Sequence, residues 1–544
     1  MNFLKQAFYG FVLLCACATN GFATPIFIQS GTWIVDSEVN GLPGRGMAID
    51  VQNQHLVMQV YNYNRAGQPT FHLASGPLNG VQFQGRLVQY RGGRFFGSGE
   101  RVGREDEVAG EVRIRFESST SGFIQFPGEP EVAMSRFRFD GVADGFLLKP
   151  DFRESWVAME FDEADRPTSA WHIDMYRDPA NGDVESLLLA SSPWYESSLA
   201  TSNPCTSMGS GGWVRCNVTF ERGAPEQQRA VFEIRKSVHG LEGFVTRAAS
   251  PQTRTRLRGS KYASYDAAAD VSHRMLHQRF QGIRFSEMRD SGMHFYVPEP
   301  GTWIVSQELN GKPGRGMAID VQNGNFVMQV YNYESNGSPS FHLAVGKMTY
   351  DLRMGVGTTA SPDVKARLKR YAGGRYFGGP ALTGREVADV GEVQLAFQSP
   401  LRGQIKFPGE DWVAIEKFQF GYGAANPEAL LGLWAFQAMG EGNLMFELSR
   451  VEGEFAKGDS ASCHYYQREP GDSEYPGIVR CYLRFLGSPT SQFIFNFDAS
   501  VENRAVPAFS TYQSMGFTYY PHKGFAVQVR DKNGTPIGFD RVRH

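Results

Sequence analysis

Long apolar runs, an excess of charge of one sign and catalytic motifs are all lacking in this sequence of 544 residues. Beyond the N-terminus no stretch approaches the roughly 18 apolar residues that a membrane-spanning helix requires, so we expect no transmembrane span. The 54 Lys and Arg residues nearly balance the 57 Asp and Glu residues, and the formal net charge is −3. So weak a balance gives no electrostatic basis for binding nucleic acid.

Motifs for common enzyme chemistry are absent as well. The chain has no G-x-S-x-G nucleophile elbow, no P-loop and no dinucleotide fingerprint. Zinc is not expected from the six cysteines, because none of them form a C-x-x-C pair. His273 and His277 are spaced i, i+4 on a predicted helix, but one stripe of side chains supplies too few ligands for a metal. We therefore predict no catalytic residue, no cofactor and no metal site.

The N-terminus has the features of an export signal. Lys5 is the only charge before an apolar run from Ala7 to Ala18, which is too short to span a bilayer. Gly21-Phe22-Ala23 then has small residues at the two positions that signal peptidase recognises. This pattern predicts a signal peptide of residues 1–23 and a periplasmic or extracellular protein. Leu14-Cys15-Ala16-Cys17 also resembles a lipoprotein cleavage box, so a lipid anchor at Cys17 stays open as an alternative.

An internal repeat dominates the rest of the chain. Residues Gly31–Gly76 and Gly301–Gly346 are identical at 33 of 46 positions, at a constant offset of 270. The offset then becomes 281, since the second copy has gained about 11 residues after Gly346, and Tyr90–Gly97 matches Tyr371–Gly378. The later part of each half is more diverged. The protein is therefore predicted to be a tandem duplication.

The repeated segment alternates apolar and polar residues as strands do. Gly46–Gln52 and Leu56–Tyr63 both have a period of two, which favours half-buried strands. Aromatic residues make up 13% of the chain, and pleated sheets accommodate them well. We predict an all-β fold in which each well-matched module is an antiparallel meander of seven or eight strands that closes into a barrel or stacks as a sandwich.

The repeat also divides the chain into units. Each half is expected to hold the well-matched β module and a second, smaller β module that contains cysteines, with one short linker helix near Tyr262–Phe280 between the halves. The predicted boundaries are 1–23 for the signal peptide, 24–144 and 145–250 for the first half, 251–296 for the linker, and 297–427 and 428–544 for the second half.

Four cysteines remain after the leader. Three pairings are possible in principle, and the duplication selects Cys205–Cys216 and Cys463–Cys481, because each pair then lies within one half. Two disulfides agree with an oxidising compartment outside the cytoplasm.

The repeated motif resembles a known family. The pattern G-x-W, then G-R-G-x-x-I-D-V-Q, then Y-x-Y-x-x-x-G-x-P-x-F-x-L spans 31–73 and 301–343, with a Gly-Gly pair at Gly92-Gly93. It is similar to a repeat of secreted proteobacterial proteins, although Phe71 and Phe341 stand where many members carry Trp. The resemblance implies an extracytoplasmic β-domain of unknown function and transfers no catalytic residue.

Strand register predicts a polar and aromatic face. Two-residue turns at Asn323-Gly324 and Asn336-Gly337 would align the three strands of the second copy, with Met317, Ile319, Met328, Val330 and Leu343 on the opposite face. The predicted face comprises Asp320, Gln329, Tyr331 and His342, and in the first copy Asp50, Gln59, Tyr61 and His72. Such a face could bind a sugar or peptide, hold an acid–base pair, meet solvent, or form a buried polar network.

Arg45 and Arg315 lie between glycines where a strand begins. A β-bulge at this bend could aim the guanidinium at an anionic ligand, or at a structural partner such as Glu38 or Glu308.

The favoured function is an exported binding or interaction module with an unidentified extracytoplasmic ligand, such as a sugar, a peptide or a protein. Two copies would raise the avidity for a repeating ligand. One alternative is a hydrolase of cell-wall or polysaccharide material that uses a carboxylate pair such as Asp50 and Glu111. The other is a structural component of the envelope.

Overall fold

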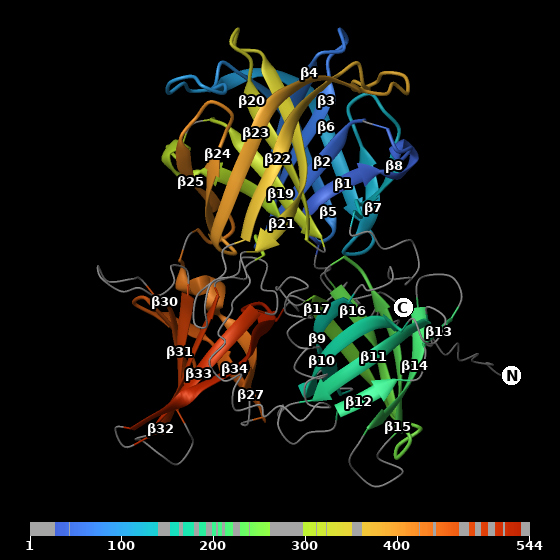
Figure 1. Ribbon diagram of the computed structural model, residues 1–544, viewed down its shortest axis with the longest axis vertical. Helices are drawn as coiled ribbons and strands as arrows, with labels where there is room; N and C mark the ends of the chain where they lie inside the picture. The colour runs from blue at the N-terminus through green and yellow to red at the C-terminus, as the bar shows by residue number, and fades with distance from the viewer. Residues whose placement is uncertain are drawn as a thin grey trace, which may run out of the picture.

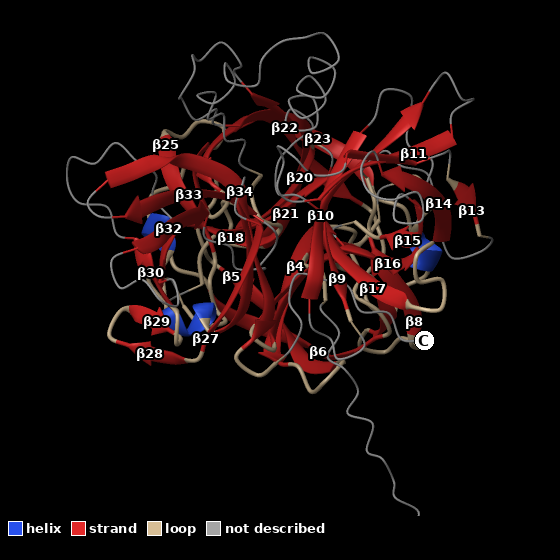
Figure 2. Cartoon of the chain, turned by 90° about the horizontal axis from the view of Figure 1, so that it is seen from below, coloured by secondary structure: helices blue, strands red, loops and turns tan. Residues whose placement is uncertain are grey.

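The computed structural model describes residues 28–534 except for the positions 43, 239, 312, 323 and 424 and the segments 140–152, 163–166, 179–183, 192–198, 203–204, 209–212, 221–228, 262–296, 351–361, 439–441, 467–477, 485–490, 499–505 and 515–516. Its elements are almost all strands, and the helices named in the described part are short 3-10 turns (Figure 2). The all-β prediction is confirmed. The predicted linker helix and signal peptide lie outside the described residues.

Two closed barrels of eight antiparallel strands stand side by side (Figure 1). Barrel 1 consists of β1 (Gly31–Val35), β2 (Gly46–Gln52), β3 (His55–Tyr63), β4 (Pro69–Pro77), β5 (Gln82–Arg91), β6 (Arg104–Phe116), β7 (Ser121–Gln125) and β8 (Val132–Arg136). Barrel 2 consists of β18 (Gly301–Val305), β19 (Gly316–Gln322), β20 (Asn325–Tyr333), β21 (Pro339–Tyr350), β22 (Pro362–Ala372), β23 (Arg385–Ser399), β24 (Arg402–Lys406) and β25 (Trp412–Lys417). Each strand pairs with the next and the last pairs with the first, so the predicted meander closes as a barrel.

The other two units are nine-stranded antiparallel sheets below the barrels in Figure 1. Sheet 1 has the order β12-β11-β10-β9-β17-β16-β15-β14-β13 with an additional β12–β14 pairing, and sheet 2 has the order β27-β26-β34-β33-β32-β31-β30-β29-β28. The strands of sheet 1 are β9 (Arg153–Phe161), β10 (Pro167–Asp178), β11 (Val184–Ser191), β12 (Leu199–Ser202), β13 (Thr206–Ser207), β14 (Trp213–Phe220), β15 (Arg229–Lys236), β16 (Gly240–Arg247) and β17 (Arg254–Lys261). Those of sheet 2 are β26 (Gly432–Ala438), β27 (Gly442–Leu448), β28 (Arg450–Glu452), β29 (Phe455–Lys457), β30 (Ala461–Tyr466), β31 (Ile478–Arg484), β32 (Ser491–Asp498), β33 (Val506–Ser514) and β34 (Phe517–Asp531).

Two details of the predicted organisation differ from the structure. With nine strands each, the sheets are not smaller than the barrels. The Arg-rich stretch assigned to the linker forms β17, which pairs with β16 on one side and with β9 on the other. The many arginines of this stretch favoured a linker, but they do not prevent a strand from forming. Alternate residues of a strand point to opposite faces of the sheet, and Leu257 is buried in the core.

Each barrel encloses its own apolar core. Trp33 lies in the core of barrel 1, packs edge-on against Phe116 with ring centroids 5.6 Å apart, and donates its indole N–H to Gln29 O at 3.0 Å. Trp303 repeats this arrangement in barrel 2, with Phe397 at 5.6 Å and Glu299 O at 2.9 Å. The tryptophan of the repeated G-x-W motif therefore fills the barrel interior.

The hairpin turns decide the register. In barrel 2 Gln322 pairs with Asn325 across a two-residue turn, and Gly324 adopts a φ of 69°, as predicted. The next turn is longer than predicted, because Tyr333 pairs with Pro339 and five residues lie between them. Asn336 stabilises this longer loop by accepting a hydrogen bond from Ser338 N at 2.9 Å. The third strand is thereby shifted by one residue from the predicted register.

Candidate functional site

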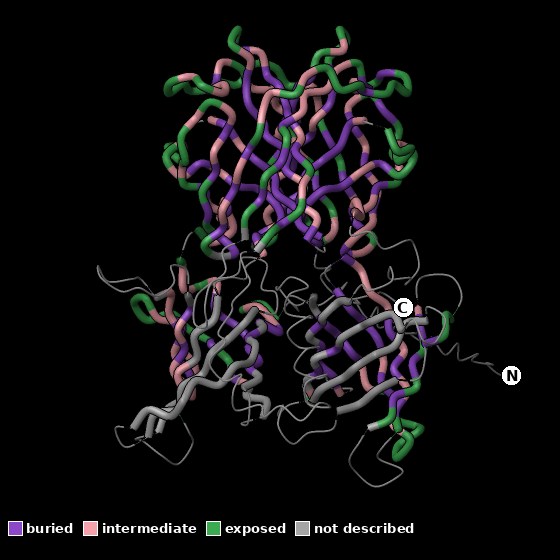
Figure 3. Tube along the Cα trace, viewed as in Figure 1, coloured by how far each residue is buried: buried purple, intermediate pink, exposed green. Residues whose placement is uncertain are grey.

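The predicted polar face is the surface through which the two barrels meet. Figure 3 shows buried residues where the barrels face each other, and Asp50, Gln59, Asp320 and Gln329 are all buried. Their partners come from the opposite barrel. The face is therefore a buried polar network, one of the alternatives that the sequence left open, and the structure gives no ligand access to it through these residues.

One half of this network is centred on Asp320. Arg136 of barrel 1 reaches it with two parallel hydrogen bonds, of 2.6 and 2.8 Å, and the side chains of both residues are almost wholly buried. The backbone N–H of Thr32 donates to the same carboxylate at 2.9 Å. A bidentate guanidinium–carboxylate pair is strong and fixes orientation. This pair therefore sets how β1 and β8 sit on β19.

The other half is centred on Asp50 and repeats the arrangement with a different cation. Lys417 Nζ lies 2.5 Å from Asp50 Oδ2, and the backbone N–H of Thr302 donates to that oxygen at 2.7 Å. Gln59 and Gln329 complete the pattern by reaching Thr302 Oγ1 at 3.4 Å and Thr32 Oγ1 at 3.3 Å. The two barrels thus form an approximately two-fold interface within one chain, of the kind that relates two subunits of a symmetric dimer.

Aromatic side chains fill the remainder of the interface. Phe341 packs against Tyr61 and Tyr63 of barrel 1 at 5.2 and 5.6 Å, and Phe71 packs against Tyr331 and Tyr333 of barrel 2 at 5.6 and 5.7 Å. Burial raises the pKa of Tyr331 well above its usual range, and its hydroxyl donates to Gln329 Oε1 at 2.7 Å. These tyrosines act as neutral packing groups.

The predicted placement of His72 and His342 is wrong. The one-residue register shift pairs Val330 with His342, so the histidine belongs to the barrel-interior face with Met317 and Val330 and not to the face of Asp320. His72 has the same position, since it pairs with Val60. Both are buried and contact asparagines within the barrel, His72 with Asn62 at 3.2 Å and His342 with Asn332 at 3.1 Å.

Each barrel also inserts a phenylalanine into the other barrel. Phe96, in the loop after β5, packs against His342 at 5.1 Å and Phe407 at 5.3 Å and joins the core of barrel 2. Phe377 does the same in barrel 1, against His72 at 5.0 Å and Phe126 at 5.2 Å. Burial lowers the pKa of His72 to about 4, and burial together with the charge of Arg370 lowers that of His342 to about 4. The histidines are therefore neutral packing groups at neutral pH.

Arg45 and Arg315 form structural ion pairs. Arg45 binds Glu38, as the sequence suggested, and also makes hydrogen bonds of 2.6 and 2.7 Å to Glu129. Burial alone would raise the pKa of Glu129, but the hydrogen bonds from Arg45 and Gly378 N outweigh it and the pKa is lowered. Arg45 lies just before β2, and the pairings of β2 with β1 and with β3 contain no register shift. The predicted β-bulge is therefore not formed.

Arg315 binds Glu308 and Glu410 in the same way. The opposite barrel adds a second cation to each cluster, Arg375 near Glu38 and Arg94 near Glu308. An anionic ligand is not needed to explain either arginine, since carboxylates already meet both guanidinium groups.

Sequence reasoning missed the partners of the predicted site residues. Arg136, Lys417, Phe96 and Phe377 come from the other barrel, whereas Glu129 and Glu410 belong to the same barrel as the arginine that each binds. A signal existed, because all three pairs occupy matching positions at the offset of 281. It pointed to the repeat and not to contact between the repeats, since a single sequence does not reveal which matched surfaces meet.

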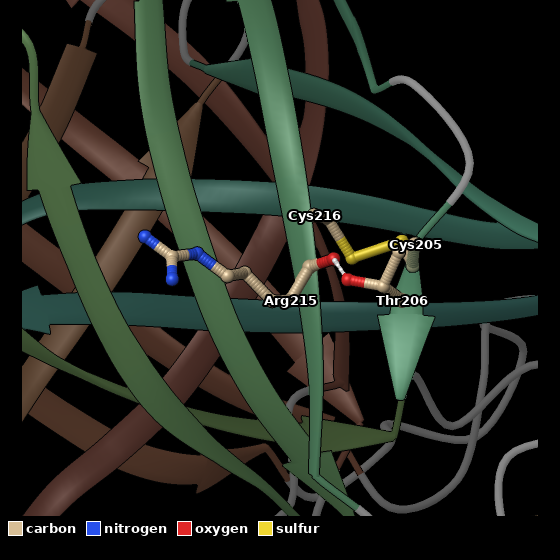
Figure 4. Close-up of a disulfide and its surroundings, with 4 residues drawn as sticks. All are labelled: Cys205, Thr206, Arg215 and Cys216. Atoms are coloured by element: carbon tan, nitrogen blue, oxygen red, sulfur yellow. Dashed lines mark hydrogen bonds between the residues drawn. A yellow bond between two sulfur atoms is a disulfide. The ribbon is translucent and has the colours of Figure 1, made fainter. Parts of the chain in front are cut away.

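Both predicted disulfides are confirmed. Cys205 is bonded to Cys216 and Cys463 to Cys481. Figure 4 shows the first of them linking the start of β13 to β14, where Thr206 Oγ1 also donates to Arg215 O at 3.4 Å. Cys463 and Cys481 are directly opposed in β30 and β31. Each bond lies within the core of its own sheet and joins no two units.

A cleft of about 620 Å³ lies between barrel 1 and sheet 1. One wall is the Ser118–Ser121 turn of the barrel with the residues that follow β8, and the other is the tip of the β15–β16 hairpin. Gln29 joins the walls, because its backbone N–H donates to Ser119 O at 3.0 Å and its side chain donates to Ser237 Oγ at 2.9 Å. Val238 at the hairpin tip is buried, which helps to hold the hairpin in place.

No helix in the described part of the chain is long and apolar enough to cross a membrane. No group of three or more His, Cys, Asp and Glu residues is placed there to hold a metal ion. Comparisons with protein-family models, with curated proteins and with solved structures gave no match.

Proposed function

We propose that this protein is an exported binding protein in which the barrel pair is a rigid scaffold and the cleft beside barrel 1 receives the ligand. The cleft carries this proposal. Its volume lies in the range of small-molecule sites, polar side chains converge on it, and it lies at the junction of two structural units, where such sites form preferentially. The barrel interface supports the scaffold role, because its ion pairs and aromatic contacts recur on both sides of the two-fold relation.

Export is part of the proposal. The predicted signal peptide supports it, and two disulfides suit an oxidising compartment. The periplasm and the extracellular space are the proposed locations, with a lipid anchor at Cys17 as an alternative. The resemblance to the secreted proteobacterial repeat points the same way and stays a prediction.

Hydrolysis is not favoured by the carboxylates that the sequence suggested. Asp50 is buried and bound by Lys417 and Thr302, which leaves it no role as an acid or base toward a substrate. Glu111 is exposed on β6 and bound to Gln84 and Arg113. A purely structural envelope component, the other alternative, would show no saturable binding at the cleft.

The export proposal is tested by fractionating bacterial cells that express the full chain. We expect a periplasmic or secreted product whose mass corresponds to cleavage before Thr24. A Cys17→Ser variant separates the two forms of export, since only a lipoprotein would change fraction. A full-length cytoplasmic product would contradict the proposal.

The binding proposal is tested with purified protein and isolated cell envelopes in a co-sedimentation assay. We expect saturable retention that is weakened in Thr120→Trp, because the indole would occupy part of the cleft. Thr383→Trp is the matched control, since Thr383 is exposed in a barrel 2 loop away from the cleft. Retention that is absent, or equal in both variants, would contradict the proposal.

A further inference from the structure

A row of four outward-facing side chains crosses the wall of barrel 2 on strands β22 to β25 (Figure 1). Lys365 is directly opposite Gln394, Gln394 is opposite Lys406, and Lys406 is opposite Trp412. We call these four residues the outer row. The residues that alternate with them lie in the barrel core or pack against it: Val364, Leu395, Ile405 and Val413. The outer row therefore faces solvent.

Trp412 presents an aromatic ring at one end of the outer row. It is 43% exposed, whereas Trp33 and Trp303 are wholly buried in the barrel cores. Its ring contacts no other aromatic ring and no cation among the described residues. Trp is enriched at binding surfaces, because its ring offers a large apolar area together with a hydrogen-bond donor.

The lysines of the outer row are available to a ligand. In the part of the chain that the structure describes, neither Lys365 nor Lys406 forms an ion pair or a side-chain hydrogen bond. Lys347 on β21 is exposed and equally without a partner there. It lies beside Lys365, because Met348 pairs with Val364. Three ammonium groups are therefore free on this wall.

Most carboxylates near the outer row are already engaged. Glu392 accepts a hydrogen bond from Gln394 Nε2 at 2.7 Å, and Glu416 accepts one from Ser306 Oγ at 3.1 Å. Asp411, next to Trp412, is exposed and has no partner within the described residues. The free lysines therefore outnumber the free carboxylate, and such a surplus attracts a polyanion.

The same wall of barrel 1 is occupied by its own contacts. The residues that match the outer row at the offset of 281 are Gln84, Arg113, Gln125 and Glu131. Glu111 binds both Gln84 and Arg113, at 2.6 and 3.0 Å. Gln125 donates to Glu129 O at 3.2 Å, and Arg115 lies 3.6 Å from Glu131. Barrel 2 has exchanged these bonded groups for a ring and two unpaired cations.

We infer that the outer row of barrel 2 binds an acidic polysaccharide, with Trp412 against the apolar face of a sugar ring and Lys406 and Lys365 against carboxylates of the chain. The row spans three interstrand distances, roughly 14 Å at about 4.8 Å each, which suits an extended ligand. It also follows the curve of a closed barrel, so a flexible chain can contact all of it, whereas a flat bilayer would touch only a part. This site is separate from the cleft beside barrel 1, and the inference goes beyond the proposed function.

The test titrates the full mature chain with three polymers in isothermal titration calorimetry. Polygalacturonate carries sugar rings and carboxylates, dextran carries the rings alone, and poly-L-glutamate carries the carboxylates alone. We expect polygalacturonate to bind at least about tenfold more tightly than poly-L-glutamate, and added salt to weaken its binding. Dextran should not bind.

Two variants separate the roles of charge and ring. Lys365→Gln/Lys406→Gln removes both cations, so the affinity for polygalacturonate should fall about tenfold or more and its salt dependence should flatten. Trp412→Ala keeps the cations, so the affinity should fall roughly fivefold while the salt dependence stays as it was. Thermal unfolding of each variant checks that the fold is intact.

Two control variants keep the result specific. Arg65→Gln/Arg86→Gln also removes two exposed cations, but from barrel 1, and should leave the affinity for polygalacturonate unchanged. Thr120→Trp alters the cleft beside barrel 1 and should leave it unchanged as well. This second control makes failure of the outer row distinguishable from failure of the cleft.

Each outcome bears on the inference. Equal binding of dextran would overturn the acidic class, and binding of poly-L-glutamate as tight as that of polygalacturonate would overturn the saccharide. Equal losses in the two lysine-free and arginine-free double variants would assign binding to net charge and not to the outer row. Absent binding of polygalacturonate, or binding that both row variants leave unchanged, would also refute the inference.

Discussion

The two barrels have stayed nearly alike, whereas the two disulfide-bearing sheets have diverged. The well-matched segment is identical at 33 of 46 positions, and it contains strands β2, β3, β19 and β20 and most of β4 and β21. Both faces of these strands are constrained. One face packs in the barrel core and the other against the opposite barrel. A substitution on either face therefore disturbs a dense contact, and a change in one copy must also suit the other.

The sheets have fewer such constraints. Each sheet has its own core, which contains a tryptophan, Trp156 or Trp434, and the disulfide of that sheet. Sheet 1 even buries a carboxylate, Glu160, which receives hydrogen bonds from Trp171, Arg247 and Thr255. The comparison indicates that contact between the copies, rather than the barrel fold alone, has preserved the repeat.

Breaking an ion pair between the barrels should have the largest effect. Asp320→Ala leaves Arg136 buried without its carboxylate, which is expected to lower the free energy of unfolding by about 3–5 kcal/mol. Asp389→Ala is the matched control, because Asp389 pairs with Arg367 on the exposed surface of barrel 2, where solvent screens the pair, and its loss should lower the free energy of unfolding far less. Denaturant unfolding at neutral pH measures both, and equal losses would show that the interface contributes little.

Acid should destabilise the barrels through the histidines buried inside them. The pKa of His72 and that of His342 are about 4 in the folded protein and about 6.5 when unfolded, so the folded state favours the neutral ring. The stability that this provides is complete above pH 6.5 and is lost as the pH falls toward 4, by about 3 kcal/mol for each histidine. Unfolding measured from pH 7 to pH 4 tests this.

The histidine prediction has a direct control. In the double variant His72→Gln/His342→Gln, the slope of stability against pH between 6.5 and 4 should be smaller than in the wild type, whatever the variant's stability at pH 7. An unchanged slope would assign the acid sensitivity to other groups.

The smallest effect is expected at the repeated Gly-Gly pair. A Cβ at Gly93 would overlap the ring of Tyr333, and one at Gly374 would overlap the ring of Tyr63. Gly93→Ala and Gly374→Ala should each cost about 1–3 kcal/mol because the tyrosine must move. Gly99→Ala is the control, since nothing lies within 4 Å there and the change should stay within about 0.5 kcal/mol. Similar midpoints for Gly93→Ala and Gly99→Ala would contradict the close approach.

Much of the fold could be predicted because it depends on local patterns. Period-two alternation in Gly46–Gln52 predicted the strands. The repeat predicted the tandem β modules and the disulfide pairs, and the Asn323-Gly324 pair predicted the register of the first hairpin. The predicted register of the second hairpin was wrong because Asn336 and Gly337 fit loops of two residues and of five residues equally well. That single step displaced both histidines from their predicted face.

The polar residues were identified correctly, but what they face was not. Sequence alone determined that Asp50, Gln59, Asp320 and Gln329 lie on one side of a pleated sheet, because alternation is a property of the strand itself. Only the tertiary structure decided that the other barrel covers this side and that the open polar surface is at the junction with sheet 1. Contacts between distant segments depend on how whole surfaces fit, and neither charge nor periodicity within one segment specifies its partner.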